Sequence, residues 1–484
     1  MRFEEPIWTS AELGASCGAI TARPWYADGL QVDSRDILPG DLFLALPGEH
    51  ADGHDFVFDA FERGAVAAVI SGKAKNVDPG DPRLVQTADT GKALDLMAKH
   101  ARFRAPAKII GVTGSAGKTS VVQALRQALE RGADAHASIK SYNNHVGVPL
   151  SLARMPRQSR FGVFEIGMSS AGEIARGAAV VRPDIAIITT VGAAHVANFQ
   201  DETAIAAEKA SLIAALPVGG TAIIGLDNAH SDLLVSEAKK ADVKPITVSV
   251  IEKADVYPVR MTEHHNCTCL TANIFGTLVT YKIAQPGREW VLNSLIVLAA
   301  VKAAGADLGQ AALALAGLEA EPGRGRAYEI NLDEGTAVLF DDSYNANPLS
   351  LKAALRRLSL TPVATGSQRI AVLADIEELG KKSEEIHLSL ISDLKQFNVD
   401  RIIAFGDQMA AIGRVAGIAT EQWKNPQNSA ADLLTCLRPG DAVMVKGANS
   451  AALTNLVQGM LKISREENEV SIGRRSATKR RATN

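Results

Sequence analysis

A glycine-rich segment between an apolar strand pattern and a helical pattern constrains this chain more than any other feature. The segment GVTGSAGKTS spans residues 111–120 and overlaps the apolar run KIIGV at 108–112. It precedes VVQALRQAL at 121–129, where apolar residues recur with a period of about 3.6. A strand, a tight glycine loop and a helix in this order place the loop where parallel sheets bind phosphate. The segment therefore predicts an α/β domain with a nucleotide site.

The loop departs from the usual phosphate-binding pattern at one position. That pattern has a glycine, four residues and then Gly-Lys-Ser/Thr, whereas Val112 stands where the first glycine would be. Gly114 still allows a tight turn, Lys118 supplies a full positive charge, and Thr119 can ligate magnesium. We therefore predict that the whole loop binds phosphate: Gly114, Ser115, Ala116, Gly117, Lys118, Thr119 and Ser120.

Strand and helix patterns alternate over most of the 484 residues and divide the chain into three regions and a tail. Residues 1–105 are rich in turns, which predicts a small α/β domain. Residues 106–320 alternate apolar runs with alanine-rich helical patterns, as in a parallel sheet covered by helices. Residues 321–463 repeat this pattern and predict a Rossmann-like domain. Residues 464–484 are basic and poor in apolar residues, which predicts a flexible tail.

Composition narrows the function classes. The net charge of −3 argues against a protein built to bind nucleic acid or an anionic membrane. The N-terminal sequence lacks a cationic region followed by an apolar core, and no apolar run is long enough to cross a bilayer. Four scattered cysteines fit a reducing compartment. We therefore expect a cytoplasmic protein that acts on small molecules, without nucleic acid and without membrane insertion. We also expect a monomer, although the oligomeric state leaves no clear mark in the sequence.

Polar residues follow three of the apolar strand patterns. Glu165, His195 and Asp342 each lie at or after such a run. The carboxyl ends of parallel strands form the edge where ligands bind in such sheets, so we expect these residues to meet in one crevice. Magnesium that bridges nucleotide phosphates prefers oxygen ligands, which Thr119 and Glu165 can supply.

Several motifs, taken in order, resemble the Mur ligases of bacterial cell-wall synthesis. The loop reads Thr-Gly-Ser-x-Gly-Lys-Thr, as in that family, and VDSR at 32–35 resembles its UDP-sugar domain. DDSYNANP at 341–348 and SYNNHVGVPL at 141–150 resemble the branch that adds D-alanyl-D-alanine to UDP-N-acetylmuramoyl-tripeptide. The resemblance implies three domains and ATP-dependent amide formation through an acyl phosphate. Because binding groups from three domains must meet in such a reaction, we also expect the domains to close on ATP and substrate.

The same resemblance implies the metal chemistry. Glu165 and His195 match family residues that hold a second magnesium ion, so two ions are expected with ATP. Lys209 matches a family lysine that carbon dioxide carbamylates, giving a carboxylate that binds magnesium. From its helical position alone, Lys209 would be interpreted as an exposed residue.

The resemblance also assigns nucleotide and substrate contacts. Arg324 matches the arginine that reaches the γ-phosphate, although Arg326 is an alternative. Asn293 matches an asparagine near the adenine, but Glu289 and Trp290 replace the His-Asn pair that precedes it in the family. The remaining matches are Asp342 for the ribose, Asn345 with Tyr344 and Asn347 for the same loop, and Ser34 and Arg35 for the uridine diphosphate.

Two late segments resemble the acceptor domain of the family, namely LADIEELG at 373–380 with His387, and VKGANS at 445–450. Alternatives remain at this stage: a MurE-like or folylpolyglutamate-synthetase-like ligase, or a nucleotide switch that ligates nothing. The third residue of the tripeptide, diaminopimelate or lysine, also stays open.

Overall fold

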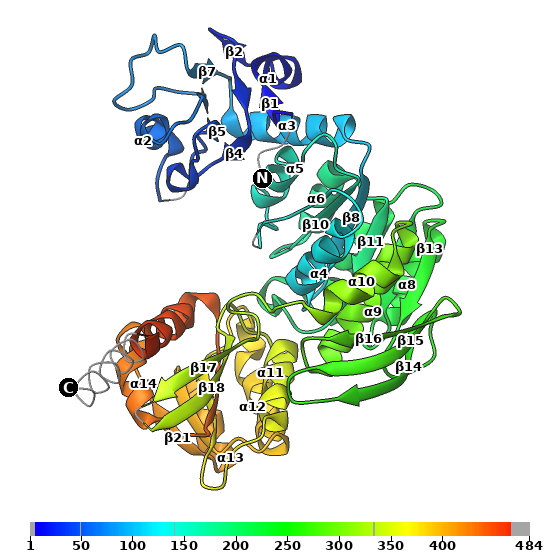
Figure 1. Ribbon diagram of the computed structural model, residues 1–484, viewed down its shortest axis with the longest axis vertical. Helices are drawn as coiled ribbons and strands as arrows, with labels where there is room; N and C mark the ends of the chain where they lie inside the picture. Colours follow the sequence, from blue (N-terminus) through cyan, green and yellow to red (C-terminus); the bar gives the residue numbers. More distant parts are fainter. Residues whose placement is uncertain (1–4, 49, 140, 333, 466–484) are drawn as a thin grey trace, which may run out of the picture.

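The structure is a computed structural model that describes residues 5–48, 50–139, 141–332 and 334–465. It contains three large sheets, arranged one after another along the molecule in chain order (Figure 1). The predicted α/β fold with a parallel central sheet is confirmed. Most of the predicted tail, residues 466–484, lies outside the described residues; Ser464 belongs to a helical segment and accepts a hydrogen bond from the Asn331 N–H at 2.9 Å.

The N-terminal sheet has the strand order β2-β7-β6-β5-β4. Strands β7, β6, β5 and β4 run parallel, and β2 pairs antiparallel with β7 at one edge. A separate pair, β1 (Trp8–Thr9) and β3 (Tyr26–Ala27), lies beside it. The other elements are α1 (Ser10–Cys17), β2 (Ile20–Thr21), β4 (Gly29–Gln31), β5 (Asp41–Leu44), α2 (Val57–Glu62), β6 (Ala67–Ile70), β7 (Leu84–Gln86) and α3 (Thr90–Arg104).

The central sheet has nine strands in the order β16-β15-β14-β13-β12-β11-β8-β10-β9. The strands from β9 to β13 in this order are parallel, because helices carry the chain back between them. Strand β14 follows β13 without a helix and makes one parallel bridge to it, between Val248 and Val256. Their bounds are β8 (Lys108–Thr113), β9 (Ala135–Ala137), β10 (Phe161–Glu165), β11 (Ile185–Ile188), β12 (Thr221–Gly225), β13 (Lys244–Val248), β14 (Val256–Glu263), β15 (Thr268–Ile274) and β16 (Thr277–Ile283).

The last three strands of this sheet form an antiparallel extension that the sequence analysis did not predict. The turn between β15 and β16 consists of Phe275 and Gly276, with φ of 52° and 85°. Two successive residues with positive φ match the twist of a two-residue hairpin, so the chain turns back directly instead of crossing through a helix.

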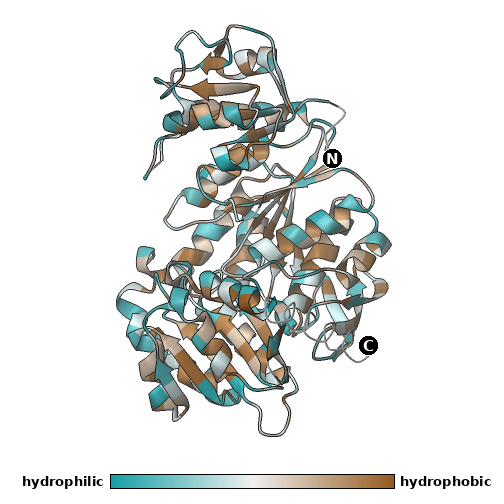
Figure 2. Ribbon diagram, turned by 60° about the vertical axis from the view of Figure 1, so that its left-hand side comes forward, coloured by the Kyte–Doolittle hydropathy of each residue, from teal (hydrophilic) through white to brown (hydrophobic). Residues whose placement is uncertain are grey.

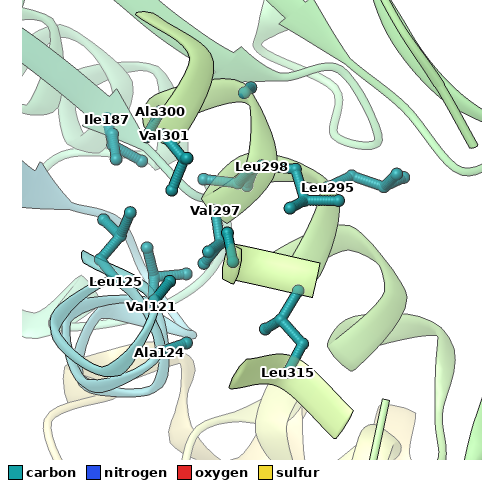
Figure 3. Close-up of a cluster of buried hydrophobic side chains, with 14 of the residues drawn as sticks. Val121, Ala124, Leu125, Ile187, Leu295, Val297, Leu298, Ala300, Val301 and Leu315 are labelled. Atoms are coloured by element: carbon teal, nitrogen blue, oxygen red, sulfur yellow. The ribbon is translucent and has the colours of Figure 1, made fainter. Parts of the chain in front are cut away.

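Seven helices of the described chain accompany the central sheet, and α9 is the longest of them, with eleven of its 16 residues buried. Figure 3 shows Leu295, Leu298 and Val301 of α9 packed among side chains of α4, α10 and β11. Because the core surrounds most of α9, it also holds the first turn of this helix in place. The seven are α4 (Lys118–Glu130), α5 (Gly147–Ala153), α6 (Glu173–Val181), α7 (Glu202–Ala214), α8 (Ser231–Lys240), α9 (Arg288–Ala303) and α10 (Leu308–Ala316).

The C-terminal sheet has the order β17-β18-β22-β19-β20-β21 and is parallel except for β17 at its edge. Apolar cores cover both faces of the sheet, and Figure 2 shows its strands as hydrophobic. The elements are β17 (Arg326–Leu332), β18 (Gly335–Asp342), α11 (Pro348–Leu360), β19 (Arg369–Ala374), α12 (Ser383–Gln396), β20 (Arg401–Phe405), α13 (Asp407–Ala416), β21 (Ala419–Gln422), α14 (Ala430–Cys436), β22 (Ala442–Lys446) and a final helical segment from residue 453.

None of the helices within the described ranges combines the length and the apolar character that crossing a membrane requires.

Candidate active site

The candidate site is a cavity of about 510 Å³ between the central and C-terminal sheets. Loops that follow β8, β10 and β11, together with the first turns of α9, form its central side. The segment before β17, the loop after β18 and one face of α11 form the opposite side. Of the predicted site residues, the cavity is lined by Ser115, Ala116, Gly117, Lys118, Thr119, Ser120, Glu165, His195, Asn293, Arg324, Asp342 and Asn345.

Four predicted site residues do not line this cavity. Gly114 is the one loop residue that does not line the cavity, and Lys209 is buried beneath the surface of the site. Ser34 is buried in the N-terminal part, whereas Arg35 is exposed and pairs with Asp33 at 2.6 Å. The N-terminal and C-terminal sheets lie at opposite ends of the molecule (Figure 1).

The phosphate loop requires both of its glycines. Gly114 has φ of +153°, and an added Cβ would lie 1.9 Å from Thr189 Oγ1. Gly117 has φ of +82°, and an added Cβ would lie 2.8 Å from Asn293 Oδ1. Helix α4 begins at Lys118, so its first backbone N–H groups face the cavity with the positive end of the helix dipole. The departure at Val112 therefore leaves the anion-binding geometry of the loop intact.

Lys118 is held over the loop by a hydrogen bond from Nζ to the Gly114 carbonyl, 2.9 Å long. Burial lowers the pKa of this amine, and Arg324 lowers it further, while the nearby Glu165 raises it. A phosphate group bound in the cavity would favour the charged amine and offset the cost of burying it.

Glu165 ends strand β10 and is almost completely buried. Thr119 Oγ1 donates a hydrogen bond to one carboxylate oxygen and Asn143 Nδ2 donates to the other, each at 2.7 Å. A hydroxyl and a carboxylate this close beside a phosphate loop are oxygen ligands of the kind that magnesium prefers. The donor set therefore fits a magnesium ion held by Thr119 and Glu165. Asn143 was not among the predicted site residues, although it lies in the segment 141–150 that carried part of the resemblance.

His195 lies in the left-handed region, with φ of +59°, just before a short turn. Its Nδ1 is 2.5 Å from a carboxylate oxygen of Glu378, which belongs to the C-terminal half of the chain. The Ala197 N–H also donates to the Glu378 carbonyl at 2.9 Å. Burial lowers the pKa of His195, while Glu378 raises it. Glu378 thus fixes the orientation of the imidazole and leaves the other ring nitrogen available.

Lys209 is buried, although its helical position alone predicted an exposed residue. It lies on α7 with 2% of its surface exposed, and its Nζ is 3.8 Å from Met168 Sδ. Burial, and then the positive charge of Lys118, hold the pKa of Lys209 well below its ordinary value. The side chain is buried because α7 packs this face on the sheet, which a helical pattern rich in alanine did not reveal.

Of the two arginines, Arg324 lines the cavity and Arg326 does not. Arg324 Nη2 donates to Ser141 Oγ at 2.5 Å, and its guanidinium lies 4.1 Å from the centre of the Tyr344 ring. Arg326 pairs instead with Glu319 at 2.9 Å at the surface.

The loop after β18 faces the phosphate loop from the opposite side. Asn347 Nδ2 donates to the Ser115 carbonyl at 3.0 Å, which joins the two loops directly. Lys446 donates to the Asn345 carbonyl at 3.0 Å and lies 3.5 Å from Asp342. Lys446 is a cavity residue that was not singled out, although it lies in the late segment 445–450.

Asn293 and Glu289 extend the cavity along α9. Asn293 is buried beside Gly117, and Glu289 lies one helical turn earlier. Burial raises the pKa of Glu289 to about 7. The resemblance indicated its position near Asn293, but its burial could not be predicted, because a charged residue at the start of a helix is ordinarily solvated.

His387 does not line the cavity and instead holds a loop through backbone hydrogen bonds. Its Nε2 accepts a hydrogen bond from the Ile376 N–H at 3.1 Å, and its Nδ1 donates to the Ser383 carbonyl at 2.7 Å. It therefore fixes the loop that carries Glu378. Within the ranges that the structure describes, no three His, Cys, Asp or Glu side chains gather closely enough to hold a metal ion by themselves.

Family models match the chain in three successive segments. The Mur ligase family catalytic domain matches residues 27–104, the Mur ligase middle domain matches 112–301, and the Mur ligase glutamate ligase domain matches 325–449. Together these segments cover most of the chain and include both sides of the cavity.

Relatives of known function match over nearly the full length. The UDP-N-acetylmuramoyl-tripeptide–D-alanyl-D-alanine ligase of Escherichia coli is 31% identical over 90% of this chain and 93% of its own. The enzyme of the same name from Bacillus subtilis is 30% identical over 91% of this chain and 95% of its own. The crystal structure of MurF from Acinetobacter baumannii matches with a TM-score of 0.79, 25% identity and coverage of 94% of this chain and 99% of its own.

Proposed function

Because this chain belongs to the Mur ligase family, we infer that it joins D-alanyl-D-alanine to UDP-N-acetylmuramoyl-tripeptide and converts ATP to ADP and phosphate. The observation that carries this assignment is the cavity, where the phosphate loop faces Arg324 and Asn347 across the two sheets. The enzyme is thus a ligase of bacterial peptidoglycan precursor synthesis.

Mur ligases use ATP and magnesium, and the donor set of this cavity fits both. Magnesium would be held by Thr119 and Glu165, and it supplies charge stabilisation to the phosphates when bound. For a second ion we propose Glu165, His195 and a carbamate on Lys209. The proximity of Lys209 to both Lys118 and His195 supports this set.

The proposed carbamate forms when the neutral Lys209 amine attacks carbon dioxide, with a new N–C bond and release of one proton. Neutrality is favoured because burial lowers the pKa of this amine. The product places a negative carboxylate beside Lys118, where the ammonium form would be repelled. The carbamate therefore gains an attractive contact that the neutral amine lacks.

We propose the following reaction sequence. The terminal carboxylate of the tripeptide attacks the γ-phosphorus, ADP leaves, and an acyl phosphate forms. The D-alanyl-D-alanine amine then attacks the acyl carbon, phosphate leaves, and the amine loses a proton. Lys118, the loop N–H groups and Arg324 stabilise the charge that develops on the transferred phosphoryl group, because fixed donors need not reorganise during the reaction.

The remaining assignments belong to the same proposal. The three regions 1–105, 106–320 and 321–463 act as domains, and Ser34 and Arg35 of the first contact the uridine diphosphate. Asp342 and Asn345 contact the ribose side of the nucleotide, and Asn293 lies toward the adenine. The domains close on ATP and substrate, and the enzyme works as a cytoplasmic monomer.

The test is phosphate release from ATP and magnesium with the tripeptide substrate alone, with D-alanyl-D-alanine alone, and with both. We expect release only with both, together with a pentapeptide product identified by its mass. Release that is indifferent to the dipeptide would contradict the ligase assignment and favour a nucleotide switch.

A further inference from the structure

Beyond the phosphate loop, the cavity continues into a slot between the first turn of α9 and one face of α11. Asn293 marks the near end, because its side chain lies beside Gly117 of the loop. Glu289 is four residues earlier on α9, so it lies on the same face and about 6 Å farther along the helix axis. On α11, Leu349 and Arg357 are two turns apart and both line the cavity.

The walls of this slot combine apolar side chains with four polar ones, Glu289, Asn293, Ser350 and Arg357. Trp290 and Leu292 line it from α9, and Leu349 and Ala353 line it from α11. A flat heteroaromatic base has two apolar faces and a polar edge, which suits a slot of this kind. With the triphosphate on the loop, the base of the nucleotide would extend toward Glu289.

The Glu289 carboxyl group is accommodated by the glycine that precedes α9. Gly287 has φ of +113°, and an added Cβ there would lie 2.2 Å from Glu289 Oε1. The carboxyl group is therefore folded back over Gly287, where any larger residue would displace it.

Neighbouring arginines are engaged by other groups. Arg356 pairs with Glu263 of β14 at 2.7 Å. Arg357 donates to the Gly325 carbonyl and lies 4.6 Å from the centre of the Phe340 ring. Glu289 thus remains a half-buried acid that faces the slot.

We propose that Glu289 recognises the polar edge of the adenine base, accepting a hydrogen bond from the 6-amino group and donating one to a ring nitrogen. This inference rests on the proposed function, which places the triphosphate of ATP on the loop. A carboxylic acid offers one donor and one acceptor side by side, which complements the amino group and adjacent ring nitrogen of adenine.

The electrostatics favour the acid form that this pairing needs. Burial raises the pKa of Glu289 to about 7, and Asp342 raises it further, whereas Arg356, Arg357 and the backbone N–H of Glu289 lower it. Below that pKa the neutral acid can donate. Above it the carboxylate has only acceptors and repels the lone pair of the ring nitrogen. Adenine binding should therefore weaken as the pH rises through about 7.

The test compares equilibrium binding of ATP with that of purine riboside triphosphate, which lacks the 6-amino group, at saturating magnesium. The protein prefers ATP by about tenfold at about pH 6, and the preference shrinks at about pH 8. Glu289→Ala removes the preference at both pH values. Glu289→Gln keeps it at both, because an amide retains a donor and an acceptor without titrating.

Glu384→Gln on the exposed surface of α12 is the matched control and behaves as the unmodified protein does. A preference for ATP that survives in Glu289→Ala would overturn the inference. So would a Glu289→Gln protein that still loses affinity for ATP as the pH rises. The binding measurement needs no dipeptide, so a failure of ligation with these results intact would contradict only the proposed function.

Discussion

At the scale of single residues, Lys209 combines deep burial with a neighbouring positive charge, which destabilises its ammonium form. A carbamate on this amine predicts that ¹³C-labelled carbon dioxide gives a carbamate resonance in the unmodified protein. Lys209→Arg, which keeps a cation but cannot form a carbamate, should lose that resonance and about 100-fold or more in turnover. Lys302→Arg, at the exposed end of α9, is the control and should change neither. A Lys209→Arg protein with full turnover would exclude the carbamate.

The residues that sequence could predict were those with distinctive local patterns. The phosphate loop was predictable because glycines and a lysine between a strand and a helix have few other uses. The surroundings of Glu289 and Lys446 were not, because Glu289 faces α11 across the cavity and Lys446 contacts the loop after the neighbouring strand β18. Likewise, the choice between Arg324 and Arg326 required the direction of each side chain.

At the scale of elements, the start of α11 connects two halves of the site. Asn347 caps this helix by accepting from the Ser350 N–H at 2.9 Å, and it donates to the Ser115 carbonyl. Asn347→Asp retains the cap but loses the donor and adds a negative charge near the phosphates, so the KM for ATP should rise about tenfold with little change in Tm. Asn347→Ala should also lose about 1 kcal/mol of stability. Equal KM values for Asn347→Asp and the unmodified protein would show that the link to Ser115 is unimportant.

At the scale of the whole molecule, the site exists only where two sheets meet. Contacts across this boundary include His195 with Glu378, Arg324 with Ser141 and Arg356 with Glu263. The parallel arrangement of the sheets could be predicted, because alternating strand and helix patterns favour parallel sheets. The antiparallel strands β14 to β16 could not, because the hairpin of β15 and β16 depends on the positive φ of Phe275 and Gly276, which the apolar pattern does not reveal.

In the proposed reaction, this cavity uses ATP to activate a carboxylate and then transfers the acyl group to an amine. The most direct measurement uses a tripeptide substrate whose terminal carboxylate carries oxygen-18, with ATP, magnesium and D-alanyl-D-alanine. Because a carboxylate oxygen becomes the bridge of the acyl phosphate, we expect one labelled oxygen in each phosphate released alongside the pentapeptide when both carboxylate oxygens carry the label. Unlabelled phosphate, or phosphate released without pentapeptide, would contradict the proposed reaction.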